Sequence, residues 1–135
     1  MITPIRAQIV LIDLGTVPNQ VVGHEQAHTR PCVVIQTLNY AQLAIVIPFT
    51  SQTPPTQIYS IVKVLQPFGG LTIDSFALCH QIRSVSYKRI AKVLGHLPDR
   101  DFNKITTVLT DFLDIWFYTK QKYRFLYVHE AVFLL

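Results

Sequence analysis

Residues 23–36 read Gly-His-Glu-Gln-Ala-His-Thr-Arg-Pro-Cys-Val-Val-Ile-Gln. The stretch passes from a polar segment, rich in groups that donate or accept protons, into an apolar, β-branched run that is typical of a strand. Arg30 stands at the junction, where a rigid strand can hold its guanidinium in place. Loop residues carried by a stiff scaffold are the usual carriers of function. The junction therefore predicts a site for a phosphate-bearing ligand.

The composition is that of a single folded domain. The chain has 135 residues, of which 50% are hydrophobic and 15% are charged, and this excludes a disordered segment. The formal charge of +4 mildly favours an anionic partner. Cys32 and Cys79 lie inside apolar runs, so we expect buried thiols and a reducing, cytoplasmic location. The Cys and His spacing does not match a zinc site, and no apolar run approaches the roughly 18 residues of a membrane span, so we expect no metal, no cofactor and no membrane association.

Short apolar runs at close spacing predict a compact barrel or half-open sheet. The expected strands are residues 6–14, 31–37, 43–49, 58–64, 75–82 and 91–96. Pro54 and Pro55 mark a turn-rich connection between the third and the fourth of these runs.

The pattern changes near the end of the chain, where residues 99–117 predict one long amphipathic helix. Its apolar stripe consists of Phe102, Ile105, Leu109, Phe112 and Trp116. Pro98 precedes the helix, and Asp99 and Asp101 suit the positive end of its dipole. The fold class is therefore α+β, with most of the sheet preceding the helix.

Residues 118–135 form an apolar, aromatic extension that ends in Val-Phe-Leu-Leu. Such a segment needs a surface to cover it, either on this chain or on a partner. The alternation of apolar residues at 123–128 suggests that it lies along the barrel or a dimer seam, as a strand or a helix extension.

Several ordered motifs resemble the MazF/PemK/Kid family of toxin endoribonucleases over residues 5–117. They are Gly-His-Glu-Gln at 23–26, Thr-Arg-Pro at 29–31, Ile-Pro-Phe-Thr-Ser-Gln at 47–52, Gly-Leu at 70–71, Asp-Ser at 74–75, Gln-Ile-Arg-Ser-Val at 81–85, Lys-Arg-Ile at 88–90 and Gly-His-Leu at 95–97. Each motif alone is weak, but all of them in this order form a specific signature. Residues 1–117 are therefore expected to be the toxin domain, and residues 118–135 lie outside the family pattern.

The resemblance implies an SH3-like β-barrel with a long C-terminal helix that works as a homodimer. It implies metal-independent, sequence-specific cleavage of single-stranded RNA and neutralisation by a cognate antitoxin. Arg30 matches the family's catalytic arginine, and Thr50 matches its catalytic threonine. The other matched or adjacent candidates are His24 and Glu25 for catalysis, and Gln26, Thr29, Ser51, Gln52, His80, Gln81 and Arg83 for RNA binding. His80 and Leu78 depart from the pattern, because some members carry an acid and an arginine there.

The chemistry of the residues agrees with these roles. RNA can be cut when its 2′-OH attacks the adjacent phosphate, and Arg30 can stabilise the resulting oxyanion. The Thr50 hydroxyl can donate a hydrogen bond to the same phosphate. Proton transfer could fall to His24, His28 or His80, of which His24 ranks first and His80 second, with Glu25 as another candidate base. The alternative for Arg30 is a surface ion pair with Glu25 or Asp13.

Two other functions remain open at this stage. The related CcdB toxins share the fold and bind DNA gyrase without cutting anything. A decayed toxin that retains only the antitoxin-binding surface is the second alternative, and the departures at Leu78 and His80 motivate it.

Overall fold

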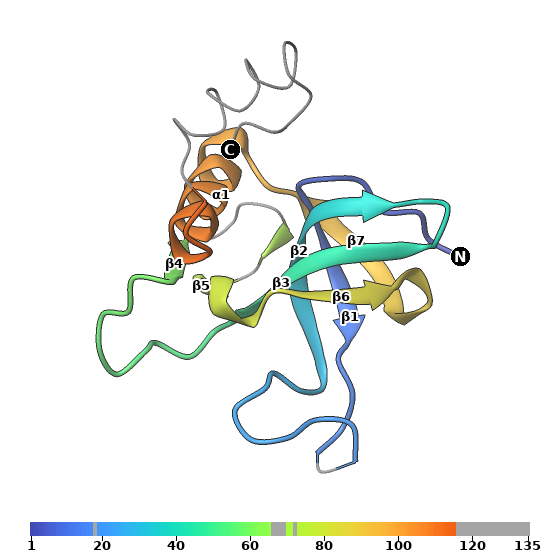
Figure 1. Ribbon diagram of the computed structural model, residues 1–135, viewed down its shortest axis with the longest axis horizontal. Coiled ribbons are helices and arrows are strands. Elements are labelled where there is room, and N and C mark those ends of the chain that lie inside the picture. Colours follow the sequence, from blue (N-terminus) through green and yellow to red (C-terminus); the bar gives the residue numbers. More distant parts are fainter. Residues whose placement is uncertain (18, 66–69, 72, 116–135) are drawn as a thin grey trace, which may run out of the picture.

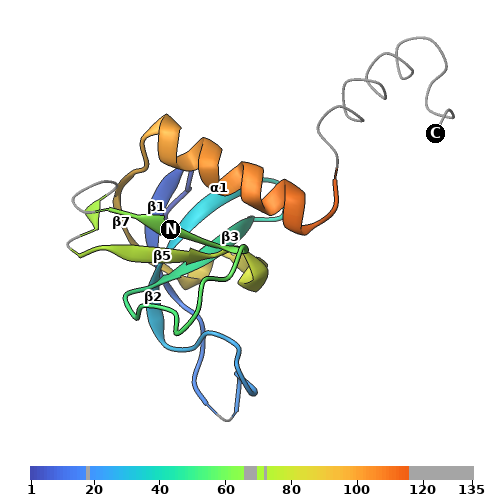
Figure 2. The ribbon, with the colours of Figure 1, turned by 90° about the vertical axis from the view of Figure 1, so that its left-hand side faces the viewer.

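The computed structural model describes residues 1–17, 19–65, 70–71 and 73–115. A curved antiparallel sheet is flanked by one helix (Figures 1 and 2). The strands are β1 (Gln8–Asp13), β2 (Thr29–Leu38), β3 (Leu43–Thr50), β4 (Ile61–Val64), β5 (Ser75–Leu78), β6 (Arg83–Ser86) and β7 (Ile90–His96), and α1 (Asp99–Phe112) follows them. The strand order is β4-β5-β3-β2-β1-β7, and β6 pairs with β3.

This arrangement confirms the α+β class and the expected barrel with a C-terminal helix. The sheet bends so that β3 pairs with two strands besides β2: with β5 through Phe49 and Thr50, and with β6 through residues 43–46. Among the described strands no ladder joins β7 to β4, so the barrel is open along that edge.

Two hydrophobic cores lie on opposite faces of the sheet. Alternate residues of a strand point to opposite faces, so Val33 joins the core under α1 and Val34 joins the second core. Ile47 and Val46 of β3 divide in the same way. Because both faces are covered, β2 and β3 read as continuous apolar runs and not as an alternating pattern.

The helix covers the first core with the predicted stripe. Phe102, Ile105 and Leu109 are buried against the sheet, and α1 begins at Asp99 directly after Pro98. The expected end near residue 117 is wrong, because Asp114 adopts φ +59° and turns the chain. The N–H of Ile115 then donates to the Thr110 carbonyl and the N–H of Asp114 donates to that of Asp111, which closes the helix as a Schellman motif.

Three further differences concern the strands. The expected strand 75–82 is shorter, since β5 ends at Leu78 and a 3₁₀ turn, η2 (Cys79–Gln81), follows it. The strand β6 was not expected, because its alternating polar sequence Arg-Ser-Val-Ser has a weak strand signal. The expected strand 58–64 begins only at Ile61. Trp116, Phe117 and the expected extension 118–135 lie outside the described residues.

Within the described part of the chain, no helix is long and apolar enough to cross a membrane. The same residues contain no group of three or more His, Cys, Asp or Glu side chains that could hold a metal ion.

Gly70 gives a test of the packing next to the expected site. It adopts φ +84°, and a Cβ at this position would overlap the Leu94 carbonyl of β7. Gly70→Ala should lower the free energy of unfolding by more than about 2 kcal/mol, because strain and overlap act together. The matched control is Gly23→Ala, where φ is +62° but no atom lies within 4 Å, and it should cost about 1 kcal/mol. Equal losses in urea unfolding would contradict this packing.

The two thiols give a second test. Both are free and buried, and burial raises the pKa of Cys32 to about 12 and that of Cys79 to about 11. Because the thiolate is the reactive form, neither thiol should react with iodoacetamide at pH 8 until the protein is unfolded. Raised pKa values also mean that the folded state holds these protons more tightly. Stability should therefore be unaffected below about pH 9 and should fall between about pH 9 and pH 12. Rapid alkylation of the folded protein would disprove the burial.

Candidate active site

Arg30 and Thr50 are brought together by the pairing of β2 with β3. Cys32 pairs with Pro48, and Val33 pairs with Ile47. When this register is continued by two residues from Cys32, Arg30 stands opposite Thr50, at the beginning of one strand and the end of the other. Both residues line the same pocket of about 300 Å³. The predicted junction at Arg30 therefore forms part of the wall of this pocket.

The pocket combines an apolar floor with a polar rim. Phe49 and Leu71 are almost fully buried and form part of its floor, so Phe49 belongs to the core. Thr29 and Ser51, both exposed, flank Arg30 and Thr50 on the rim. A ligand in this pocket would meet hydroxyl groups and a guanidinium over a surface that excludes water.

The guanidinium of Arg30 is held without an acidic partner. The side chain is half-buried, and its Nε donates a hydrogen bond to the Ala27 carbonyl at 2.9 Å. No described carboxylate pairs with it, so the alternative of an ion pair with Glu25 or Asp13 does not hold. The guanidinium therefore has no described acidic partner, and a guanidinium can bind phosphate oxygens in pairs.

The hydroxyl of Thr50 is oriented by a backbone hydrogen bond. Its Oγ1 accepts a hydrogen bond of 3.2 Å from the backbone N–H of Gln52. A hydroxyl that accepts in this way keeps its own proton to donate. Gln52 itself is exposed, so its side chain is accessible to a substrate.

A second arginine lies on the same face of the sheet. Residues directly opposite in an antiparallel ladder share a face, and so do alternate residues of one strand. Cys32 pairs with Pro48, and Arg83 pairs with Val46, so Arg83 shares the face of Arg30. Although burial dominates and raises the pKa of the Cys32 thiol, the charges of Arg83 and Arg30 both lower it, because both guanidinium groups lie near the sulfur. The face therefore carries a short positive strip.

The polar loop is tied to this strip by one side chain. Gln81 donates from Nε2 to the His24 carbonyl at 2.9 Å, which joins the loop between β1 and β2 to η2. His24 and Glu25 are exposed, and a Glu25 carboxylate oxygen accepts a hydrogen bond from the N–H of Val22 at 3.4 Å. The Oε1 atom of Gln26 is buried and has no hydrogen-bond partner among the described residues. The loop therefore lies beside Gln81.

His80 has a partner that the sequence did not reveal. Its Nδ1 lies 2.9 Å from the Oγ of Ser60, which is buried, while the histidine itself is exposed. Ser60 also accepts a backbone hydrogen bond from Cys79 at 3.0 Å. The two residues are 20 positions apart, and no local motif connects them. Only the pairing of β4 with β5 brings them together.

Comparison with known proteins identifies the family. The family described as "PemK-like, MazF-like toxin of type II toxin-antitoxin system" matches residues 5–113. The Endoribonuclease EndoA of Bacillus subtilis is 30% identical over 107 residues, which span 77% of this chain and 89% of that protein.

Solved structures show the same fold at lower identity. MazF from Deinococcus radiodurans is 22% identical with a TM-score of 0.67, over 84% of this chain and 99% of that one. An endoribonuclease in complex with its cognate antitoxin, from a mycobacterial species, is 19% identical with a TM-score of 0.66, over 85% of this chain and 99% of the other. The expected resemblance is thereby confirmed: the chain belongs to the PemK-like, MazF-like toxins of type II toxin–antitoxin systems.

Proposed function

We propose that this toxin is an endoribonuclease that cuts single-stranded RNA at short sequence motifs, without a metal ion, and that a cognate antitoxin neutralises it. The similarity to an endoribonuclease of Bacillus subtilis supports the activity. The single observation that carries the mechanism is that Arg30 lines a pocket together with Thr50 and has no acidic partner among the described residues.

The reaction uses the nucleophile that RNA itself supplies. The 2′-OH attacks the adjacent phosphate and the 5′-oxygen leaves, which gives a 2′,3′-cyclic phosphate and a 5′-hydroxyl end. Negative charge builds up on the non-bridging oxygens in the transition state. Arg30 and the Thr50 hydroxyl bind these oxygens, and one such donor contributes about 3–4 kcal/mol.

Two places offer groups for proton transfer. His24 and Glu25 lie on the loop that Gln81 ties to η2. His80 lies in η2 and is oriented by Ser60. A positioned acid or base of this kind accelerates such reactions by about 10²- to 10⁴-fold. Of these groups we favour His24 or Glu25, because they share a loop with Arg30.

The remaining polar residues form the proposed RNA-binding surface. Arg83 holds phosphate next to the scissile bond, and Gln81 contacts a base edge. Gln26, Thr29, Ser51, Gln52 and His80 extend this surface on the loops around the pocket. Because the proposed substrate is cellular RNA, we place the protein in the cytoplasm.

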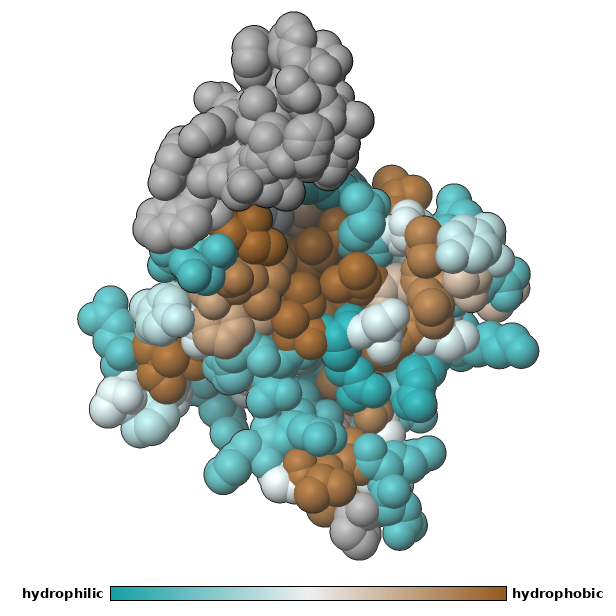
Figure 3. All heavy atoms as spheres, in the orientation of Figure 1, coloured by the Kyte–Doolittle hydropathy of each residue, from teal (hydrophilic) through white to brown (hydrophobic). Residues whose placement is uncertain are grey.

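A homodimer agrees with the apolar surface of β3. Ile47 is buried beneath α1, but Ile45 and Leu43 on the same face of the strand are 40% and 37% exposed. In Figure 3, apolar side chains gather on the face turned to the viewer. A contiguous apolar surface of this kind is typical of an interface, and a second copy of the chain would cover it.

Replacement of Arg30 tests the proposal. Arg30→Ala should lower the rate of RNA cleavage in EDTA by about 100- to 1000-fold, because the transition state loses its main cationic donor. Lys92→Ala is the matched control: it removes one exposed positive charge on β7 and should leave the rate nearly unchanged. The measurement is single-turnover cleavage of a long unstructured RNA, with mapping of the 5′ ends. An RNA with a 2′-deoxy sugar at the mapped site should remain uncut.

Two results would favour the other functions. If neither the wild type nor the Arg30→Ala variant cuts any of several RNAs of varied sequence, the protein is a decayed toxin. Inhibition of gyrase supercoiling without RNA cleavage would indicate a CcdB-like, non-enzymatic toxin.

The proton-transfer group can be identified by three conservative variants. The variants are His24→Asn, Glu25→Gln and His80→Asn. One of them should lower kcat by about 100-fold and flatten the pH profile of kcat, and the other two should mainly raise KM. We expect the large effect at His24 or Glu25. If all three variants keep the wild-type kcat, the proton is transferred by another group or by water.

A further inference from the structure

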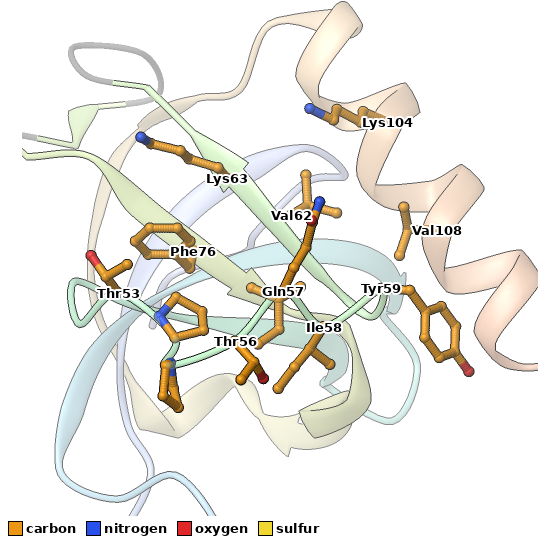
Figure 4. A pocket seen from close by; sticks show the side chains of 13 residues that line it. Thr53, Thr56, Gln57, Ile58, Tyr59, Val62, Lys63, Phe76, Lys104 and Val108 are labelled. Atoms are coloured by element: carbon orange, nitrogen blue, oxygen red, sulfur yellow. The ribbon is translucent and has the colours of Figure 1, made fainter.

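A groove of about 550 Å³ lies beside α1, outside the proposed active site (Figure 4). One wall is the loop 53–59, the floor comes from β4 and β5, and the other wall is the exposed side of the helix. The lining includes Tyr59, Val62, Phe76, Lys104 and Val108.

The groove is apolar with positive charge along one side. Lys63 and Lys104 are the only charged residues among those that line it, and Figure 4 shows both on the upper side of the view. The Nζ of Lys63 lies 3.9 Å from an Asp74 carboxylate oxygen, whereas Lys104 makes no ion pair with any described residue. The complementary occupant is an apolar segment that carries a carboxylate.

The described chain ends next to this groove. The ring of Phe112, at the end of α1, lies 6.0 Å from the ring of Tyr59, which lines the groove. The Schellman turn at Asp114 then redirects the chain, and Ile115 is the last described residue. The chain after Ile115 therefore continues from a point three residues past Phe112, whose ring lies near the groove residue Tyr59.

The sequence beyond this point has the required chemistry. Nine of the eleven residues 125–135 are apolar, and Glu130 is the only Asp, Glu, Lys or Arg among them. The fifteen residues from 116 to 130 span at least about 22 Å even if helical, whereas Lys104 and Ile115 are separated by about 16 Å along a helix. The reach is therefore sufficient. The family match ends at residue 113, so this segment is additional to the shared toxin domain.

We propose that residues 125–135 lie in the groove between loop 53–59 and α1 of the same chain, with Glu130 beside Lys104. The apolar side chains of the segment cover Tyr59 and Val108, and its carboxylate neutralises Lys104. The loop 53–59 directly follows Thr50, Ser51 and Gln52, so docking also holds the loop that borders the active-site pocket. The inference does not depend on the ribonuclease activity.

Disulfide trapping in the full chain tests this placement. Gln57→Cys combined with Val132→Cys should form an intramolecular disulfide under mild oxidation, because Gln57 is exposed on the groove wall. The native thiols, Cys32 and Cys79, are buried and should not compete. The matched control is Lys92→Cys with Val132→Cys, since Lys92 is exposed on β7, away from the groove. The groove pair should cross-link at least tenfold faster than the control pair. Equal rates, or a disulfide between two molecules, would overturn the proposal.

Charge reversal provides the second arm. In the groove pair, Lys104→Glu should slow cross-linking several-fold, and adding Glu130→Lys should restore the rate. Lys104 is exposed, so the fold should survive, and thermal melts of each variant check this. An unchanged rate in both variants would show that Glu130 does not lie beside Lys104 and would overturn the assignment.

Discussion

The pairing of β2 with β3 is the constraint on which the rest of the structure depends. Its register, with Cys32 opposite Pro48, determines which side chains can meet at the end of the two strands. Because both faces of these strands are buried, a slip of one residue would move every core side chain to the wrong core, and the register is therefore strongly specified. Arg30 and Thr50 take their positions from this ladder and not from the loops.

The two cores explain how so small a domain holds a charged site. One core is closed by α1 and the other by β6 and the segment around Tyr87. Arg30 and Arg83 lie at the border of the second core, near a buried thiol whose pKa is raised to about 12. Removing water from one side of these guanidinium groups strengthens their interaction with an anion on the other side. The scaffold thus positions the two guanidinium groups of the proposed anion site before any ligand arrives.

The expectations from sequence succeeded where a pattern was long and periodic. The stripe of α1, the Pro98 start and the apolar runs of β2 and β3 all follow from the spacing of apolar residues. They failed where a local feature overrode the pattern. Asp114 ends the helix by adopting a positive φ, which the stripe could not show. The strand β6 is polar and short, so only its partner β3 makes it a strand.

The sequence by itself determined the family and the fold class and supplied the candidate site residues, since ordered motifs and hydrophobic periodicity are local properties of the chain. Only the tertiary structure decided that Arg30 lacks an acidic partner among the described residues, that Ser60 orients His80, and that Gln81 ties the polar loop in place. These contacts join residues up to 57 positions apart. They depend on strand register and on the bend of the sheet, which arise from packing across the whole domain and leave no signal in any short stretch of sequence.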